Sequence, residues 1–365
     1  MTERRGKTLL KVAGRITLML NLLAALALWA CCASTWLHPA DFPHLALAGL
    51  LFPIVLAVNL CFVLIWIPIN YKRIWIPLAT TLPCLGFLLD YCPMSFGSIE
   101  APEGSIKLLT WNTANYGTEW EDKEEGRFLT TEYIKDSQAD IICLQESSIW
   151  KEAIKDFSNS MDSMGYYSDR DHGTVLFSRY PILDGDTLQY DTKGDKGART
   201  NSSKWYKLLI GGDTIVLVNN HLESNHLREE VKSRYVETLD RPEYEGIRES
   251  GHNIGSRLKK STTLRGYQTD SLVLLTKRFE TYPIIFCGDF NDTPISYTYQ
   301  HLKRVLKSAY RESGKGIGLS YNQRGFWVRI DHIFVSEHWQ TYNTHIDNSI
   351  RTSDHYPLVS WLKLR

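Results

Sequence analysis

The sequence predicts an α/β fold of the α+β kind, in which two mixed β-sheets are flanked by helices and preceded by three transmembrane helices. Two observations lead to this prediction. The first 90 residues are dominated by long apolar stretches, whereas the remainder combines short β-branched runs with longer helix-like segments. The short runs sometimes follow one another directly and sometimes alternate with helices, which is typical of mixed sheets covered by helices.

Residues 1–90 have the composition of a membrane anchor. Apolar stretches cover 16–37, 45–69 and 74–89. The first two reach the roughly 20 residues that span a bilayer, whereas the third is shorter and contains Pro77 and Pro83. We therefore expect three spans, the third resting on the weakest signal.

The basic residues around these stretches predict their orientation. Five precede the first stretch, two stand in "NYKR" after the second, and none follows the third until Lys107. The positive-inside rule then places a multi-pass anchor in the plasma (inner) membrane, with the N-terminus cytoplasmic and the chain after residue 90 extracytoplasmic. A third stretch that only re-enters the membrane would invert this orientation. A cleaved signal peptide over the first stretch is a further alternative, which Trp29 and the later apolar segments disfavour.

Charge and cysteine content limit the function of the remaining chain. Residues 101–365 carry 34 Lys and Arg against 37 Asp and Glu, so no global positive charge indicates nucleic-acid binding. Only Cys143 and Cys287 lie in this part, each inside an apolar run, and we expect both to be free and buried. Their spacing does not resemble a cysteine metal site.

The chain after the anchor divides into a linker and one domain. Residues 91–104 are rich in Pro, Gly and Ser and read as a linker, and the domain covers 105–365. Strand-like runs are expected at 106–111, 140–144, 173–178, 204–210, 214–219, 283–287, 330–335 and 357–361. Helices are expected near 124–138, 226–239, 259–279 and 296–308.

Carboxylate, carboxamide and imidazole residues stand at the ends of these runs. They are Asn112, Glu146, His221, Asp289, Asn291, Asp331, Asp354 and His355. Carboxylates gathered at one rim repel one another unless a cation neutralises them, so the cluster predicts a divalent metal. Oxygen and amide ligands without cysteine favour a hard ion, Mg²⁺ or Mn²⁺.

The order of the motifs around these residues resembles a known family. "LLTWNTANYG", "DIICLQE", "GTVLFSRYPI", "VLVNNHLES", "IIFCGDFND", "RIDHIFVS" and "SDHYPLV" follow the order found in the endonuclease/exonuclease/phosphatase family. This family of metal-dependent phosphoesterases includes pancreatic-type deoxyribonucleases, apurinic-site endonucleases, bacterial sphingomyelinases and inositol-polyphosphate phosphatases. "GDFND" and "SDHYP" are the most specific motifs. The resemblance covers about residues 105–365 and implies a four-layer sandwich.

The resemblance also implies a role for each site residue. Glu146 would be the main metal ligand, Asn112 would contact the metal or the phosphate, and Asp354 would be a further metal or water contact. The implied catalytic residues are His221, Asp289, Asn291, Asp331 and His355. In this scheme Asp331 orients His355, and His221 stabilises the phosphate or protonates the leaving oxygen. The sequence leaves open whether Asp289 or His355 takes the proton of the attacking water.

The substrate is less well defined. The resemblance implies a membrane-anchored, metal-dependent phosphodiesterase of nuclease-like type that uses in-line attack of a water. A sphingomyelinase-like or inositol phosphodiesterase or phosphatase is the alternative, and a silent scaffold is a third. The substrate is thus nucleic acid or a phospholipid or phosphosugar, and no protein partner is predicted. Neither an apolar hairpin for lipid insertion nor a series of aromatic residues for base stacking is evident.

Three local features complete the predictions. Basic residues gather at 192–204 and 251–268, either as solvated faces or as a rim beside the site. The second stretch overlaps a long insertion at about 223–262 that follows His221. Asp292 is expected to be a turn or cap residue before the helix near 296.

Overall fold

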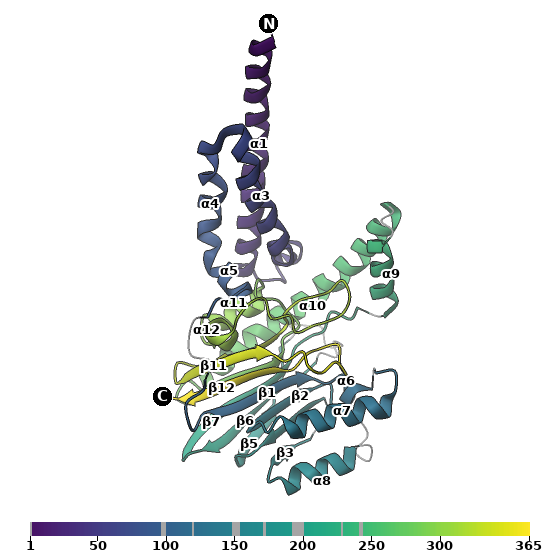
Figure 1. Ribbon diagram of the computed structural model, residues 1–365. Helices are drawn as coiled ribbons and strands as arrows, with labels where there is room; N and C mark the ends of the chain where they lie inside the picture. Colours follow the sequence, from purple (N-terminus) through teal and green to yellow (C-terminus); the bar gives the residue numbers. More distant parts are fainter. Residues whose placement is uncertain are drawn as a thin grey trace.

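Residues 2–91 of the computed structural model form a helical unit beside the rest of the chain (Figure 1). The structure describes residues 2–95, 100–118, 120–147, 154–170, 173–191, 201–227, 229–240 and 244–365. The unit contains α1 (Thr2–Ala33), η1 (Ser34–Trp36), α2 (Pro43–Ala46), η2 (Leu47–Leu51), α3 (Phe52–Asn70), η3 (Tyr71–Arg73), α4 (Trp75–Thr81), η4 (Leu82–Cys84) and α5 (Leu85–Tyr91).

Within the described chain, two helical stretches are long and apolar enough to cross a bilayer, Lys11–Trp36 and Pro43–Arg73. The prediction of a third transmembrane helix over 74–89 is wrong, because α4 and α5 have only 7 residues each and η4 separates them. Proline explains the break, since it lacks an N–H and its ring clashes with the preceding turn. Pro83 lies in the first turn of η4. The broken segment nevertheless leads the chain back beside α1 towards the sheets (Figure 1).

Among the described residues, the sheets contain twelve strands, which are β1 (Ile106–Asn112), β2 (Ile141–Gln145), β3 (Tyr167–Asp169), β4 (Thr174–Ser178), β5 (Ile182–Thr187), β6 (Ser203–Ile210), β7 (Asp213–His221), β8 (Ile284–Asp289), β9 (Lys307–Ser308), β10 (Asp331–Val335), β11 (Trp339–Ile346) and β12 (Leu358–Leu364). The strand order is β11-β12-β1-β2-β4-β3 in the first sheet and β5-β6-β7-β8-β10-β9 in the second. Each sheet has a parallel pair, β1 with β2 and β7 with β8, beside antiparallel pairs, so both sheets are mixed, as predicted.

Helices connect the strands, and most of them pack against the two sheets. They are α6 (Ala114–Gly117), α7 (Lys123–Asp136), α8 (Lys155–Ser163), α9 (Glu229–Asp240), α10 (Tyr244–Arg278), α11 (Tyr297–Lys303) and α12 (Ala309–Ser313). One apolar core lies between the sheets, a second joins the first sheet to α7 and α8, and a third joins the second sheet to α10 and α11. This arrangement confirms the α/β sandwich of two mixed sheets flanked by helices.

Each predicted strand is present, whereas the helices differ in length. α10 begins at Tyr244 and is 35 residues long, so part of the expected insertion is helical and extends away from the sheets together with α9 (Figure 1). Cys143 and Cys287 are free and buried in the core between the sheets, as expected.

The helical unit contacts the domain beside the loop that follows β8. A Cβ on Gly49 of η2 would lie only 1.9 Å from the carbonyl oxygen of Ile295, so no side chain fits at this position. Asp90 at the end of α5 is buried and accepts a hydrogen bond from Gln300 Nε2 at 2.9 Å. The linker expected at 91–104 is described only at 91–95 and 100–104, and the residues between lie outside the described structure.

Candidate active site

The strand pairing brings the polar residues to one rim of the two sheets. β1 and β2 are parallel and end at Asn112 and Gln145, directly before Glu146. β7 and β8 are parallel and end at His221 and Asp289, which are register partners. Because the carboxyl ends of parallel strands lie at the same edge, each sheet presents a pair of polar residues at this rim.

Two antiparallel strands add residues from their starting ends. β10 runs antiparallel to β8, which places Asp331 opposite Asp289. β12 runs antiparallel to β1, so His355, three residues before β12, reaches the same end of the sheet. The indole Nε1 of Trp111 fixes this segment by donating to the carbonyl oxygen of His355 at 2.9 Å.

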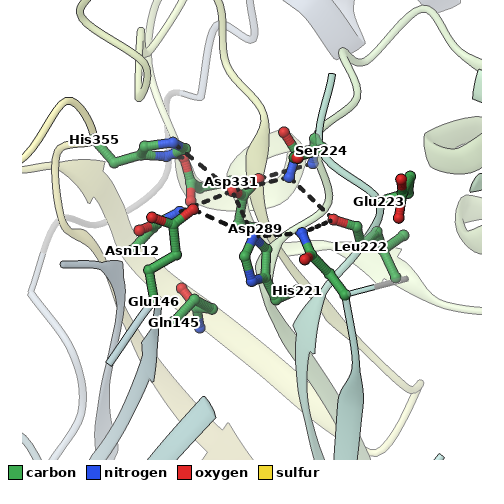
Figure 2. Close-up of polar contacts among 12 residues, drawn as sticks. Asn112, Gln145, Glu146, His221, Leu222, Glu223, Ser224, Asp289, Asp331 and His355 are labelled. Atoms are coloured by element: carbon green, nitrogen blue, oxygen red, sulfur yellow. Dashed lines mark hydrogen bonds and ion pairs between the residues drawn. The ribbon is translucent and has the colours of Figure 1, made fainter. Parts of the chain in front are cut away.

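A continuous set of polar contacts joins the two sheets (Figure 2). The amide nitrogen of Asn112 donates to Glu146 Oε1 and to Asp289 Oδ2, each at 3.1 Å. Asn291 donates its backbone N–H to Asp289 Oδ1 at 2.8 Å and its side-chain amide to Oδ2 at 3.1 Å. Asn291 and Glu146 both have positive φ angles, of 53° and 47°, so the chain turns sharply where each side chain enters the site.

Asp331 and His355 form the expected pair. His355 Nδ1 lies 2.8 Å from Asp331 Oδ2, and both side chains are buried. This contact directs the other ring nitrogen, Nε2, towards the site, where it lies 3.7 Å from Asp289 Oδ2. An aspartate that holds one imidazole nitrogen fixes the tautomer and stabilises the protonated ring.

His221 lies on the other side of Asp289. Its Nε2 is 3.8 Å from Asp289 Oδ2 and 3.6 Å from Glu146 Oε1. The side-chain amide of Asn201 lies 3.0 Å from the same nitrogen, and because an amide nitrogen only donates, His221 Nε2 accepts. Asn201 lies in the basic stretch at 192–204, of which residues 192–200 are outside the described structure. The sequence indicated a basic charge in that stretch but did not indicate the contact of Asn201 with His221.

Burial and neighbouring charges change the proton affinities of the buried groups. Burial raises the pKa of Asp289 to about 7. Burial also lowers the pKa of His221 to about 4. For His355, burial acts to lower the pKa, but the carboxylates of Asp331 and Asp289 overcome it and hold the pKa well above its ordinary value. The two histidines therefore differ in charge near neutral pH, with His221 neutral and His355 protonated.

The side chains of the site fit a hard divalent cation. One ligand atom from each of Asp289, Asp331 and His355 lies within 4.8 Å of the others. Oδ1 of Asp331 is buried and has no hydrogen-bond partner within the described part of the chain. A cation beside these carboxylates would stabilise their charged forms and so offset the cost of burying them. Because His355 is protonated, the ligands left for a cation are carboxylate oxygens, which suit Mg²⁺ or Mn²⁺.

The predicted metal ligands differ in how they face this cluster. Glu146 Oε1 accepts a hydrogen bond from the side-chain amide of Asn112 in the site. Asn112 directs its amide nitrogen into the site, because its Oδ1 accepts from the backbone N–H of Ala114 at 3.2 Å. In this orientation the amide nitrogen of Asn112 can donate a hydrogen bond to a phosphate or carboxylate oxygen. Asp354 lines the same cavity but pairs with Lys232 at 4.0 Å. The assignment of these three as metal contacts remains a prediction.

Asp292 has a role that differs from the predicted cap. Its carboxylate is buried and pairs with the Arg265 guanidinium at 3.3 Å, while the cap of α11 is the hydroxyl of Ser296. Arg265, taken from the sequence as part of a basic stretch, is 2% exposed. Nothing in the sequence indicates that an arginine and an aspartate 27 positions apart form an ion pair.

A buried amide network behind the site was also missed. Gln145 Nε2 donates to Asn219 Oδ1 at 2.6 Å, which links β2 of one sheet to β7 of the other. Asn219 in turn donates to the carbonyl oxygens of Leu144 and Val175. These bonds hold the two sheets in register directly beneath the candidate site. The consecutive polar residues in "LQE" and "VNNH" were the sequence feature that could have indicated this network.

The fold and the rim of acidic, amide and imidazole groups define a two-sheet α/β sandwich protein with a polar site where the strands end. The profile of the Endonuclease/Exonuclease/phosphatase family matches residues 109–355, and the chain belongs to this family. Its members are generally phosphoester hydrolases and typically use a divalent metal. A second profile, described as a domain of unknown function (DUF8431), matches residues 14–91. No match was found among curated proteins.

Solved structures support the fold. The human Nocturnin catalytic domain with bound sulfate is 19% identical, with a TM-score of 0.51, and the match covers 72% of this chain and 95% of that one. A family protein from Bacteroides thetaiotaomicron is 18% identical, with a TM-score of 0.51 and coverage of 73% and 100%. A humanized D. rerio TDP2 is 14% identical, with a TM-score of 0.50 and coverage of 71% and 99%.

Proposed function

We propose that the chain is a membrane-anchored phosphoesterase that depends on Mg²⁺ or Mn²⁺ and hydrolyses a phosphodiester bond by in-line attack of water. The observation that carries the proposal is the buried contact of Asp331 with His355 at 2.8 Å, beside Asp289 and across from Glu146 (Figure 2). A cation held by Glu146 and the neighbouring carboxylates would neutralise the non-bridging phosphate oxygens and acidify a bound water.

The protein side chains supply the remaining chemistry. Asp289 is held by Asn112 and Asn291 through three hydrogen bonds, so its free lone pairs have a fixed direction and can orient and deprotonate the water. His355, protonated and fixed by Asp331, can donate from Nε2 to a phosphate oxygen. His221 lies across Asp289 from His355 and is placed to contact the other side of the phosphate.

The two candidate spans would anchor the protein in a bilayer, and the broken segment α4–η4–α5, which returns beside α1, would carry the chain back across, so that the domain is extracytoplasmic. Arg73 at the far end of α3 donates to the carbonyl oxygen of Gly14 at 3.1 Å, whereas η2 at the near end of α3 lies against Ile295 of the domain. Lys72, Arg73 and the basic N-terminal residues thus lie at the end of the helical unit that is remote from the domain (Figure 1). The positive-inside rule favours a cytoplasmic location for that end.

Hydrolysis of bis(4-nitrophenyl) phosphate tests the proposed reaction. We expect Mg²⁺- or Mn²⁺-dependent release of 4-nitrophenol by the full chain. His355→Ala and Glu146→Ala should each lower the rate at least about 100-fold, because each removes a group that acts on the phosphate or its metal. His338→Ala is the matched control, since His338 is exposed and outside the site. Unchanged rates in both site variants would refute the assignment, and an inactive wild type would favour a silent scaffold.

A further inference from the structure

The candidate site opens into a cavity with two chemically different ends. The cavity has a volume of about 420 Å³. Glu146, Asp289, Asn291, Asp354 and His355 line its polar end. The remaining lining includes the apolar side chains of Leu47, Leu50, Leu258, Ile295, Val328 and Phe326. Polar residues such as Asn225 and Thr262 complete the lining. A ligand that joins an anionic group to an apolar one would match both the catalytic residues and this apolar wall.

The helical unit supplies part of the apolar wall. Leu47 and Leu50 belong to η2, between the two candidate spans, and lie across the cavity from residues of the domain. Gly49 between them brings η2 against the backbone of Ile295. Ile295 lies in the loop after β8, which also contains Asn291 and directly follows Asp289, so the catalytic segment and the anchor meet at the cavity. A tether that only held the domain near a membrane would not need to line the site.

An exposed aromatic residue lies in a segment that lines the cavity. Trp327 is 59% exposed and stands between Phe326 and Val328, which both line the cavity. Arg329, which follows Val328, is buried and donates to the carbonyl oxygens of Ile317 and Asp90. These hydrogen bonds hold the segment against the end of α5. Trp327 is thus an exposed aromatic side chain that is held next to the cavity.

We infer that the substrate is a membrane phospholipid, whose phosphate enters the polar end and whose hydrocarbon chain lies between η2 and the domain. This inference rests on the proposed function. In the reaction, the water oxygen bonds to phosphorus and the phosphorus–oxygen bond to the alcohol breaks. One water proton ends on the leaving alcohol oxygen and the other ionises from the new phosphate, so no oxidant or reductant is needed. The apolar chain contributes binding energy by leaving water.

A nucleic-acid substrate fits the same cavity less well. Binding of nucleic acid relies on clustered basic side chains along the backbone and on aromatic stacking. Residues 101–365 carry an excess of acidic over basic residues. Arg265, which lines the cavity, is already paired with Asp292, and Lys232 pairs with Asp354. The apolar wall would also contact a sugar–phosphate backbone without any compensating hydrogen bond.

Photo-crosslinking tests the lipid site without turnover. The full chain is placed in nanodiscs of phosphatidylethanolamine and phosphatidylglycerol that contain a trace of phosphatidylglycerol with an acyl-chain diazirine, in EDTA. We expect cross-links on the domain peptide that contains Leu258, in addition to those on α1 and α3. Leu50→Trp should reduce the Leu258 cross-link at least about tenfold by filling the cavity. Leu51→Trp is the matched control, because Leu51 is 53% exposed and does not line the cavity.

The cross-links on α1 and α3 show whether each variant still folds in the bilayer. Val328→Trp fills the cavity from the domain side and should give the same loss as Leu50→Trp. Absence of the Leu258 cross-link in the wild type, or equal yields in the wild type and both cavity variants, would overturn the inference.

A parallel rate assay separates this inference from the proposed function. With Mg²⁺ present, phospholipid hydrolysis and bis(4-nitrophenyl) phosphate hydrolysis are measured for the same samples. The ratio of the two rates should fall at least about tenfold in Leu50→Trp and stay within about twofold in Leu51→Trp. Hydrolysis of the soluble ester without any cross-link would refute the lipid site alone. A cross-link without hydrolysis of either ester would refute the proposed function alone.

Discussion

Replacement of Asp292 by alanine should strongly destabilise the protein. The Asp292 carboxylate accepts from Arg265 Nε at 3.3 Å and from the Thr298 hydroxyl at 2.9 Å. Arg265 is 2% exposed and Asp292 is 6% exposed, so water cannot replace the lost carboxylate. The variant keeps the contacts of Arg265 with the carbonyl oxygen of Glu223 and with Asn225 but leaves the buried positive charge without its counter-charge.

The size of the effect follows from this burial. Breaking a buried ion pair by removing one partner costs about 3–5 kcal/mol, because the remaining charge stays buried without compensation. At about 4 kcal/mol, the melting temperature of a domain of this size should fall by roughly 8–16 °C. Asp240→Ala is the matched control, since its partner is also an arginine, Arg324, but both side chains are more than half exposed. An exposed pair contributes about 0–1 kcal/mol.

Thermal unfolding of the full chain in detergent, followed by tryptophan fluorescence, measures both variants. The double variant Arg265→Met with Asp292→Ala should melt at a higher temperature than Asp292→Ala alone, because it removes the unpaired charge. If Asp292→Ala melted within about 3 °C of the wild type, as expected for Asp240→Ala, the proposed importance of the buried pair would be wrong.

Two further predictions concern the same region. Burial lowers the pKa of His332 to about 3. Below about pH 6.5 the unfolded chain therefore takes up a proton at this histidine, whereas the folded chain does not. The free energy of unfolding should fall by about 1.4 kcal/mol per pH unit as the pH drops from about 6 to about 3. Acid titration of stability should show this added slope in the wild type and in His338→Phe and lose it in His332→Phe, and an unchanged slope in His332→Phe would contradict the assignment. Gly49→Ala should destabilise the full chain by about 1–3 kcal/mol by forcing η2 away from Ile295, while Gly86→Ala, where a Cβ meets nothing within 4 Å, should not lower the melting temperature. Equal melting temperatures for the two glycine variants would refute the close contact.

The strands of the site were predictable because they are short, apolar, β-branched runs that are bounded by polar residues. The run "PIIFCGDFND" ends in polar residues, and β8 ends at Asp289, two residues beyond the predicted strand at 283–287. The pairing of β10 with β8, which places Asp331 beside Asp289, was not readable from these runs. Strand order depends on contacts between residues that are far apart in the sequence. The order of the motifs indicated this arrangement only through the family resemblance.

Other features depend on contacts that a sequence pattern does not encode. The break between α4 and α5 follows from prolines that were visible in the sequence, but the apolar composition of 74–89 outweighed them in the prediction. The burial of Arg265 follows from where α10 packs, since a basic residue on a helix is usually solvated. The wall that η2 contributes to the cavity requires the helical unit and the domain to meet, which no local pattern indicates.

The central claim is that the Asp289 carboxylate and a divalent cation act together on a phosphodiester. The most direct measurement is the rate of bis(4-nitrophenyl) phosphate hydrolysis by the chelated full chain as Mg²⁺ or Mn²⁺ is added back, in the wild type and in Asp289→Ala. We predict no hydrolysis in the chelated wild type, a saturable return of activity with the metal, and a rate at least about 100-fold lower in Asp289→Ala at every metal concentration. Equal activity with and without the metal, or a wild-type rate in Asp289→Ala, would contradict the account.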